Sequence, residues 1–125
     1  MERFCLDSSA WMEYFQGTAK GARLKKAFLT NASFFTPVVV LTEIGSKAIR
    51  NNEDFSLRLQ TIKSLSTIVP TSEKIAVAAA GYKAKHRPYA LDALVYASAI
   101  EVDSILLSED WTMLPMKGVK SLRQL

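Results

Sequence analysis

Four carboxylates occupy positions where side-chain chemistry is expected. Asp7 closes a short apolar run typical of a buried strand, and Asp110 closes another near the end of the chain. Glu43 and Asp92 instead fall early in predicted helices and have mostly apolar neighbours. Each acid alone has a structural explanation, as a helix cap, a partner of a helix dipole, a turn residue or a solvent-facing charge. Two acids at strand ends and two in early helix turns nevertheless indicate one shared site.

Bringing these four acids together requires a compensating positive charge. A buried, unpaired carboxylate is costly, and two carboxylates about 4 Å apart repel by roughly 4 kcal/mol at an effective dielectric near 20. The chain has one cysteine, Cys5, and one histidine, His86, which alone cannot form a zinc site. Oxygen ligands favour Mg²⁺ or Mn²⁺. Such an ion activates water for attack on a phosphodiester.

The elements that position these acids alternate between short apolar runs and helices of about ten residues or more. This order predicts parallel strands joined by right-handed crossovers, with helices on both faces of the sheet. The predicted fold is therefore α/β, a three-layer α/β/α arrangement around a central, mostly parallel sheet, in a single domain over residues 1–125. Ligands of such sheets gather outside the carboxyl ends of the strands.

Turn and cap residues set the predicted boundaries. The first helix follows Asp7, with Ser8 or Ser9 as its N-cap and Gly17 at its end. Thr36 is predicted to cap the helix that carries Glu43, with Pro37 in its first turn. The remaining predicted elements are the helices GARLKKAFLT, FSLRLQTIKSL, SEKIAVAAAGYKAK and Leu91–Glu101, and the strands SFFTP, TIV, SILLS and VKSL, the last at an edge.

Composition bounds the class of protein. Apolar residues make up 49% and charged residues 22% of the chain, as in an ordinary soluble globular protein. The first fifteen residues contain Glu2, Asp7 and Glu13, unlike a signal peptide, and charges interrupt every apolar stretch well before 18 residues. We expect a cytoplasmic protein that does not enter a membrane.

The net charge of +4 permits a polyanionic partner. Lys83, Lys85 and Arg87, just before the helix of Asp92, are candidate contacts to RNA phosphates, although a solvated helix end explains them equally well. A group of aromatic residues in the early helices belongs either to the core or to a partner surface. This group comprises Trp11, Tyr14, Phe15, Phe28 and Phe55.

Four segments in this order resemble the PIN-domain ribonucleases, most of all the small VapC-type toxins of prokaryotic toxin–antitoxin pairs. The segments are LDSS, VVVLTEI, ALDALVYASAI and ILLSED. The resemblance spans nearly the whole chain and implies that the acidic quartet of the family, which coordinates Mg²⁺ or Mn²⁺, falls on Asp7, Glu43, Asp92 and Asp110. It further implies endonucleolytic hydrolysis of RNA, a homodimer, and an antitoxin peptide in a groove near the acids.

Two hydroxyl residues are candidate supporting groups in this resemblance. Ser8 follows the first acid, and Ser108 stands two places before the last, where the family usually has Thr. Met113 replaces an aromatic residue that is common three places after the last acid, which puts only local packing in question. Glu109 alternates away from its neighbour in an extended chain and is at most an outer partner, while Asp103 precedes its strand and is a poor ligand.

Other phosphate chemistries fit less well. A haloacid-dehalogenase-type phosphatase needs a second Asp where this chain has Ser9, and a receiver domain needs adjacent acids after the first strand. Neither a Walker A loop nor a G-x-G-x-x-G motif occurs. The sequence therefore predicts a metal-dependent endoribonuclease, the toxin of a toxin–antitoxin pair. The alternative is a non-catalytic PIN-like module that binds RNA or protein.

Overall fold

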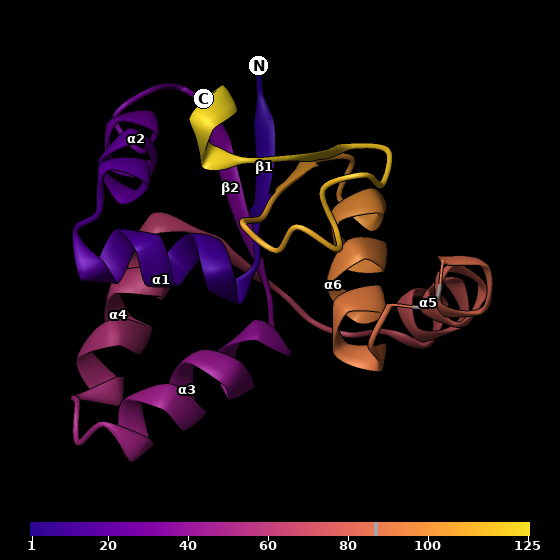
Figure 1. Cartoon of the computed structure of the whole chain (residues 1–125), viewed down its shortest axis with the longest axis horizontal. Coiled ribbons are helices and arrows are strands. Elements are labelled where there is room, and N and C mark those ends of the chain that lie inside the picture. Colours follow the sequence, from indigo (N-terminus) through magenta and orange to yellow (C-terminus); the bar gives the residue numbers. More distant parts are fainter. Residues whose placement is uncertain (87) are drawn as a thin grey trace.

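The computed structural model of the chain describes residues 1–86 and 88–125 and consists of one sheet between two layers of helices (Figure 1). The strands are β1 (Arg3–Leu6), β2 (Ser33–Pro37), β3 (Thr67–Val69), β4 (Ile105–Leu107) and β5 (Val119–Lys120). The helices are α1 (Ser8–Gln16), α2 (Ala19–Ala27), α3 (Val40–Arg50), α4 (Phe55–Leu65), α5 (Glu73–His86) and α6 (Ala90–Glu101), followed by the 3-10 turn η1 (Leu122–Gln124).

The sheet has the order β3-β2-β1-β4-β5, with β1 at its centre. All four pairings between its strands are parallel. In the register, Cys5 of β1 stands beside Phe35 on one side and Leu106 on the other. Helices α1 to α4 lie on one side of the sheet, and α5 and α6 lie on the other (Figure 1). The predicted three-layer α/β/α class is confirmed, and β5 is the predicted edge strand.

The N-cap of helix α1 lies before the two serines that the sequence predicted for it. Its N-cap is Asp7, in an extended conformation, and the carboxylate accepts a hydrogen bond from the backbone N–H of Ala10. The prediction of Ser8 or Ser9 as the cap is therefore wrong, because both residues already belong to the first turn. Gly17 ends the helix as predicted, with φ of 68° in the left-handed region that favours glycine.

The prediction of Thr36 as the cap of α3 is also wrong. Thr36 and Pro37 end β2, and α3 begins at Val40 without a side-chain cap. The Thr36 side chain is fully buried. Its hydroxyl accepts a hydrogen bond from the indole N–H of Trp11 at 3.0 Å and lies 2.7 Å from the Ser66 hydroxyl. This tertiary pairing holds Thr36 in the strand, where a local helix cap would have pulled it out.

The early aromatic residues pack into the core, which confirms that alternative over a partner surface. Trp11 is fully buried, and its ring stacks against those of Phe15 and Phe28 with centroids 5.6 Å apart. Tyr14 and Phe55 are partly buried against the same cluster. Among the described helices, none is both long and apolar enough to cross a membrane.

Candidate active site

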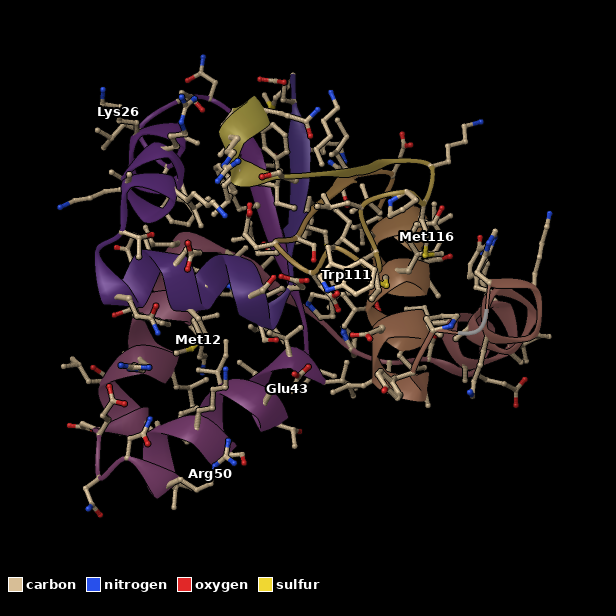
Figure 2. All side chains as sticks on the ribbon, in the orientation of Figure 1. Met12, Lys26, Glu43, Arg50, Trp111 and Met116 are labelled. Atoms are coloured by element: carbon tan, nitrogen blue, oxygen red, sulfur yellow. The ribbon has the colours of Figure 1, made fainter. Side chains whose placement is uncertain are left out.

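The sheet topology gathers the four acids (Asp7, Glu43, Asp92 and Asp110) at one end of the molecule. Asp7 directly follows β1, and its backbone N–H donates to the carbonyl of Leu107, the last residue of the neighbouring strand β4. Asp110 lies three residues beyond that strand. Glu43 and Asp92 stand in the first turns of α3 and α6. All four are partly buried, and Glu43 lies at the end of α3 nearest α6 (Figure 2).

Electrostatic coupling joins the four acids. Burial raises the pKa of Asp92 above its ordinary value, and the negative charges of Asp110 and Glu43 raise it further. The charge of Asp92 in turn acts on Asp7. Asp92 is thus the acid that interacts electrostatically with each of the other three. A cation placed among the four would relieve this repulsion.

Asp7 combines a structural and an electrostatic role. Burial raises its pKa to about 6, against hydrogen bonds from Ser108, Ser9 and the backbone of Ala10 that lower it. The hydroxyl of Ser9 donates to Asp7 Oδ1 at 2.6 Å, and the Ala10 N–H donates to the same atom at 3.0 Å. Both bonds fix the carboxylate in one orientation at the helix N-terminus, which itself favours negative charge.

A chain of hydroxyl groups connects Asp7 to Asp110. The Ser9 hydroxyl donates to Asp7, and its oxygen lies 3.4 Å from the Ser108 hydroxyl oxygen. Ser108 Oγ accepts from the backbone N–H of Asp110 at 3.1 Å, and Ser9 Oγ accepts from that of Glu109 at 2.8 Å. The two strand-end acids are therefore positioned by one continuous network.

The side chain of Asp110 is oriented by its own turn. Its Oδ1 accepts from the backbone N–H of Thr112 at 2.9 Å and from the Thr112 hydroxyl at 2.7 Å. Met113, which replaces the aromatic residue noted in the resemblance, is 2% exposed and packs in the core. Its thioether side chain therefore anchors the loop in place of a ring.

Glu109 faces away from the acids and has a structural role. Its carboxylate lies 2.9 Å from the Lys20 ammonium and accepts from the Ser121 hydroxyl and the Leu122 N–H. Although burial acts to raise its pKa, these hydrogen bonds hold the pKa below its usual value. Glu109 thus ties α2 and the C-terminal turn to the strand end. Asp103 is exposed at the opposite end of β4, consistent with its rejection as a ligand.

The four acids are chemically suited to hold a metal ion, but their carboxylates lie too far apart to coordinate one in this conformation. Within the described residues, no group of three or more His, Cys, Asp or Glu side chains lies close enough together to bind an ion as it stands. The four acids offer only oxygen ligands, which suit a hard divalent cation. The raised pKa values of Asp7 and Asp92 mark where that cation would stabilise charge. Coordination requires these side chains to move together.

The other described residues selected from the sequence lie in α5 and α1. Lys83 and Lys85 are exposed in the last turn of α5, and Lys83 Nζ donates to the Pro88 carbonyl at 3.4 Å. Arg87 lies outside the described residues. Ser8 is the first residue of α1. The contacts to Asp7 come instead from Ser9, which sequence reasoning passed over.

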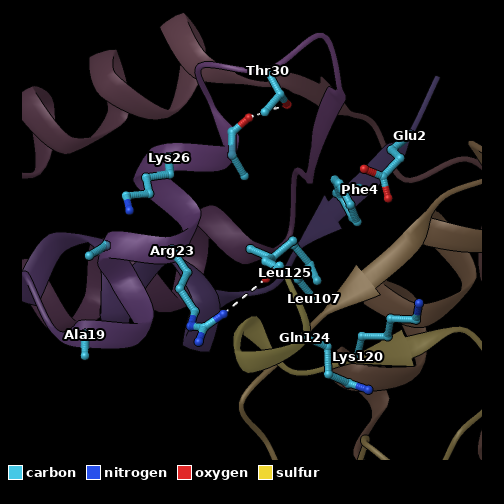
Figure 3. Close-up of a pocket in the computed structure, with 12 residues that line it drawn as sticks. Glu2, Phe4, Ala19, Arg23, Lys26, Thr30, Leu107, Lys120, Gln124 and Leu125 are labelled. Atoms are coloured by element: carbon cyan, nitrogen blue, oxygen red, sulfur yellow. Dashed lines mark hydrogen bonds between the residues drawn. The ribbon is translucent and has the colours of Figure 1, made fainter.

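A separate cleft of about 590 Å³ lies between α2 and the sheet and contains none of the four acids. Figure 3 shows Arg23 and Lys26 on one side of it, Phe4 and Lys120 on the other. The Arg23 guanidinium spans it to donate to the Leu125 carbonyl at 3.1 Å. Because none of the four acids lines this cleft, it is not the candidate active site.

Comparison with known proteins shows the family and the fold of this chain. The sequence matches the PIN domain family over residues 4–117. No curated protein matches it significantly. In fold it is similar to a toxin–antitoxin complex from Klebsiella pneumoniae, with a TM-score of 0.80, 16% identity, and coverage of 94% of this chain and 96% of the other.

Two further structures have the same fold. VapBC2 from Rickettsia felis, bound to a DNA fragment from its promoter, has a TM-score of 0.78 and 12% identity, covering 95% of this chain and 98% of the other. Mycobacterium tuberculosis VapC20, a sarcin–ricin loop cleaving toxin, has a TM-score of 0.69 and 15% identity, covering 90% and 94%. By its sequence match and its fold, which is that of VapC-type structures, the chain belongs to the PIN-domain family.

Proposed function

We propose that this protein is a metal-dependent endoribonuclease that hydrolyses RNA phosphodiester bonds and acts in the cytoplasm as the toxin of a toxin–antitoxin pair. The observation that carries the proposal is the electrostatic coupling of the four acids at the carboxyl end of the sheet, centred on Asp92, in a chain of the PIN-domain family. A cation among these acids would offset their mutual repulsion and keep them charged at neutral pH.

Each acid has a defined part in this proposal. Asp7, Glu43, Asp92 and Asp110 would hold Mg²⁺ or Mn²⁺, which when bound lowers the pKa of a water molecule and stabilises charge on the phosphate. Ser9 and Ser108 hold the two strand-end acids in position through their hydroxyl network. Because the ion and an activated water suffice for hydrolysis, no covalent intermediate on the protein is required.

RNA is the proposed substrate because the chain is positively charged and because its fold is similar to that of an RNA-cleaving toxin. The chain carries a net charge of +4. Lys83 and Lys85 are exposed in the last turn of α5, the helix that precedes α6 and Asp92 in the chain. Exposed cations of this kind bind phosphates and position the strand. VapC20, which shares the fold, is described as cleaving the sarcin–ricin loop.

A protein partner is part of the same proposal. Several structures of this fold are toxin–antitoxin complexes, including those from Klebsiella pneumoniae and Rickettsia felis. We propose a cognate antitoxin that covers the acids, and a homodimer as the free form. Light scattering of the purified protein, alone and with the product of a neighbouring reading frame, would measure both assemblies.

Cleavage of a labelled structured RNA in Mn²⁺, with and without EDTA, tests the nuclease function. We expect cleavage by the unmodified protein, none with EDTA, and none by Asp92→Asn. The matched control is Asp103→Asn, because Asp103 is an exposed acid at the other end of β4. This variant should cleave normally. RNA binding without cleavage under any divalent metal would instead identify a non-catalytic binding module.

A further inference from the structure

In the part of the chain that the structure describes, two large aromatic side chains are exposed, and each stands close in sequence to one of the four acids. Tyr89 is 83% exposed and Trp111 is 79% exposed. Among the described residues, every other Phe, Tyr and Trp side chain is buried or partly buried. Rings exposed to this extent add little to the core, and Tyr and Trp are the aromatic residues enriched at binding interfaces.

Both aromatic residues are tied by the backbone to the acids. Trp111 directly follows Asp110, and Tyr89 is the N-cap of α6, one helical turn before Asp92 and Ala93. Figure 2 shows the Trp111 indole between α1 and α6, in the part of the molecule where Glu43 also lies. Each ring is therefore carried on a segment that also carries one of the four acids.

A cleft of about 540 Å³ connects the segments that carry the rings. Tyr89 and His86 line it from one side, and Thr112, Met116 and Lys117 from the other. Thr112 is the residue that holds the Asp110 carboxylate. The cleft thus combines the Tyr89 ring, the Met116 side chain and the Lys117 ammonium group, and Thr112 links it to Asp110.

The loop that carries Trp111 is held rigidly although its ring is exposed. Met113 is buried in the core two residues later. The Tyr96 hydroxyl of α6 donates to the Lys117 carbonyl at 2.6 Å. On the other side of the cleft, Lys83 donates to the Pro88 carbonyl beside Tyr89. Both rings are therefore presented on anchored backbone, which reduces the entropy lost on binding.

We propose that Trp111 and Tyr89 form a stacking platform for unpaired RNA bases beside the phosphodiester that is cleaved, an inference that rests on the proposed nuclease function. Bases stack on aromatic side chains with little regard to sequence, and cations beside them bind the backbone. Lys83, Lys85 and Lys117 supply the cations. In a duplex the bases stack on one another, so the platform selects single-stranded segments.

The emission of Trp111 gives a direct test. The chain has two tryptophans, and Trp11 is fully buried, so solvent-exposed emission comes from Trp111. Oligouridine is titrated into the full-length protein with Ca²⁺ replacing Mg²⁺, and a gel checks that the RNA stays intact. We expect oligouridine to quench this emission, and an abasic oligonucleotide of equal length to quench it much less. Trp111→Phe should lose the signal.

Affinity for labelled oligouridine, measured by fluorescence anisotropy, tests the energetic role. Trp111→Ala and Tyr89→Ala should each weaken binding by roughly tenfold, whereas Trp111→Phe, which keeps a ring, should bind better than Trp111→Ala. Leu57→Ala, which removes an apolar side chain of α4 that is 61% exposed, is the control and should bind normally.

Equal binding of base-containing and abasic oligonucleotides, or unchanged affinity of both alanine variants, would overturn the platform and assign the exposed rings to a protein partner. The outcome is separable from that of the nuclease proposal. Cleavage in Mn²⁺ without quenching would refute the platform alone. Quenching without cleavage under any divalent metal would refute the nuclease and leave a base-binding surface.

Discussion

At the scale of single residues, Asp7 shows how one side chain serves the fold and the site together. Its carboxylate caps α1 through the Ala10 N–H and accepts from the Ser9 hydroxyl. The same group is desolvated and lies near the charge of Asp92, so its pKa rises to about 6. The cap bond therefore holds the carboxylate in a buried position, where burial disfavours its charged form in the absence of a cation.

Asp7→Asn should stabilise the metal-free protein at alkaline pH. The pKa of Asp7 is higher in the folded state than its ordinary 3.8, so its contribution to stability is full below pH 3.8 and is lost as pH rises through about 6. Asn caps helices as well as Asp and stays neutral. We expect the variant to exceed the unmodified protein by up to about 3 kcal/mol at pH 8, measured by urea unfolding in EDTA.

The same comparison at pH 4 supplies the control for Asp7→Asn. There the folded protein already carries a protonated Asp7, and the advantage of the variant should shrink to well under about 1 kcal/mol. An advantage of equal size at both pH values would show that burial does not raise the pKa of this carboxyl.

Ser9→Ala should be more destabilising than Ser8→Ala. Ser9 donates to Asp7 and accepts from the Glu109 N–H, so its loss leaves both groups partly unsatisfied and should cost about 1–3 kcal/mol. Ser8 stands beside it without a side-chain hydrogen bond among the described residues, and its replacement should cost less than about 0.5 kcal/mol. Urea unfolding of both variants measures the difference, and equal effects would contradict the network.

The sequence selected four acids, whose role stays a prediction, and it selected Ser8 where Ser9 contacts Asp7. Strand ends and early helix turns are readable from apolar runs, which is why Asp7, Glu43, Asp92 and Asp110 were selected. Ser8 and Ser9 are chemically identical neighbours, and only the capped geometry of α1 turns Ser9 toward the carboxylate. Thr112 was missed because its bond to Asp110 depends on the turn after β4.

At the scale of helices and strands, close packing of α1 against α2 depends on one glycine. A Cβ atom added at Gly21 would lie 2.0 Å from the backbone oxygen of Glu13. Backbone atoms cannot move aside as a flexible side chain does. The two helices therefore approach at a distance that only glycine permits.

Gly21→Ala and Gly81→Ala should have opposite effects on stability. The first forces α1 and α2 apart and should cost about 1–3 kcal/mol or more. The second lies within α5 with no atom near its added methyl group, and it should gain about 0.5–1 kcal/mol. Thermal unfolding of both variants measures the signs. A stabilising Gly21→Ala would mean that the helices are not in close contact.

Most elements followed from periodicity and caps, and the error at Thr36 arose where tertiary contacts overrode a local pattern. α4 matches its predicted span of residues 55–65, and β3 matches the segment TIV, because local pattern and burial agree there. Thr36 and Pro37 carry strong helix-start signals but end β2, since Thr36 is buried against Trp11 and Ser66. Partners 25 and 30 residues away in the chain leave no trace in a local pattern.

At the scale of the whole molecule, the parallel topology determines what the acids can do together. Placing β1 beside β4 brings Asp7 next to the segment of Asp110, and the crossovers return α3 and α6 with Glu43 and Asp92 to the same end. The α/β class was predictable from the alternation of runs. The exposed aromatic pair was not, because exposure depends on which residues the folded core leaves outside.

Titration of Mn²⁺ into the metal-free protein, followed by calorimetry, tests the central claim most directly. We predict that the unmodified protein binds Mn²⁺ and that Asp92→Asn, which removes the acid coupled to the other three, binds it far more weakly, while Asp103→Asn binds normally. Equal Mn²⁺ binding by Asp92→Asn and the unmodified protein, or no binding by either, would contradict a metal centre built from these four carboxylates.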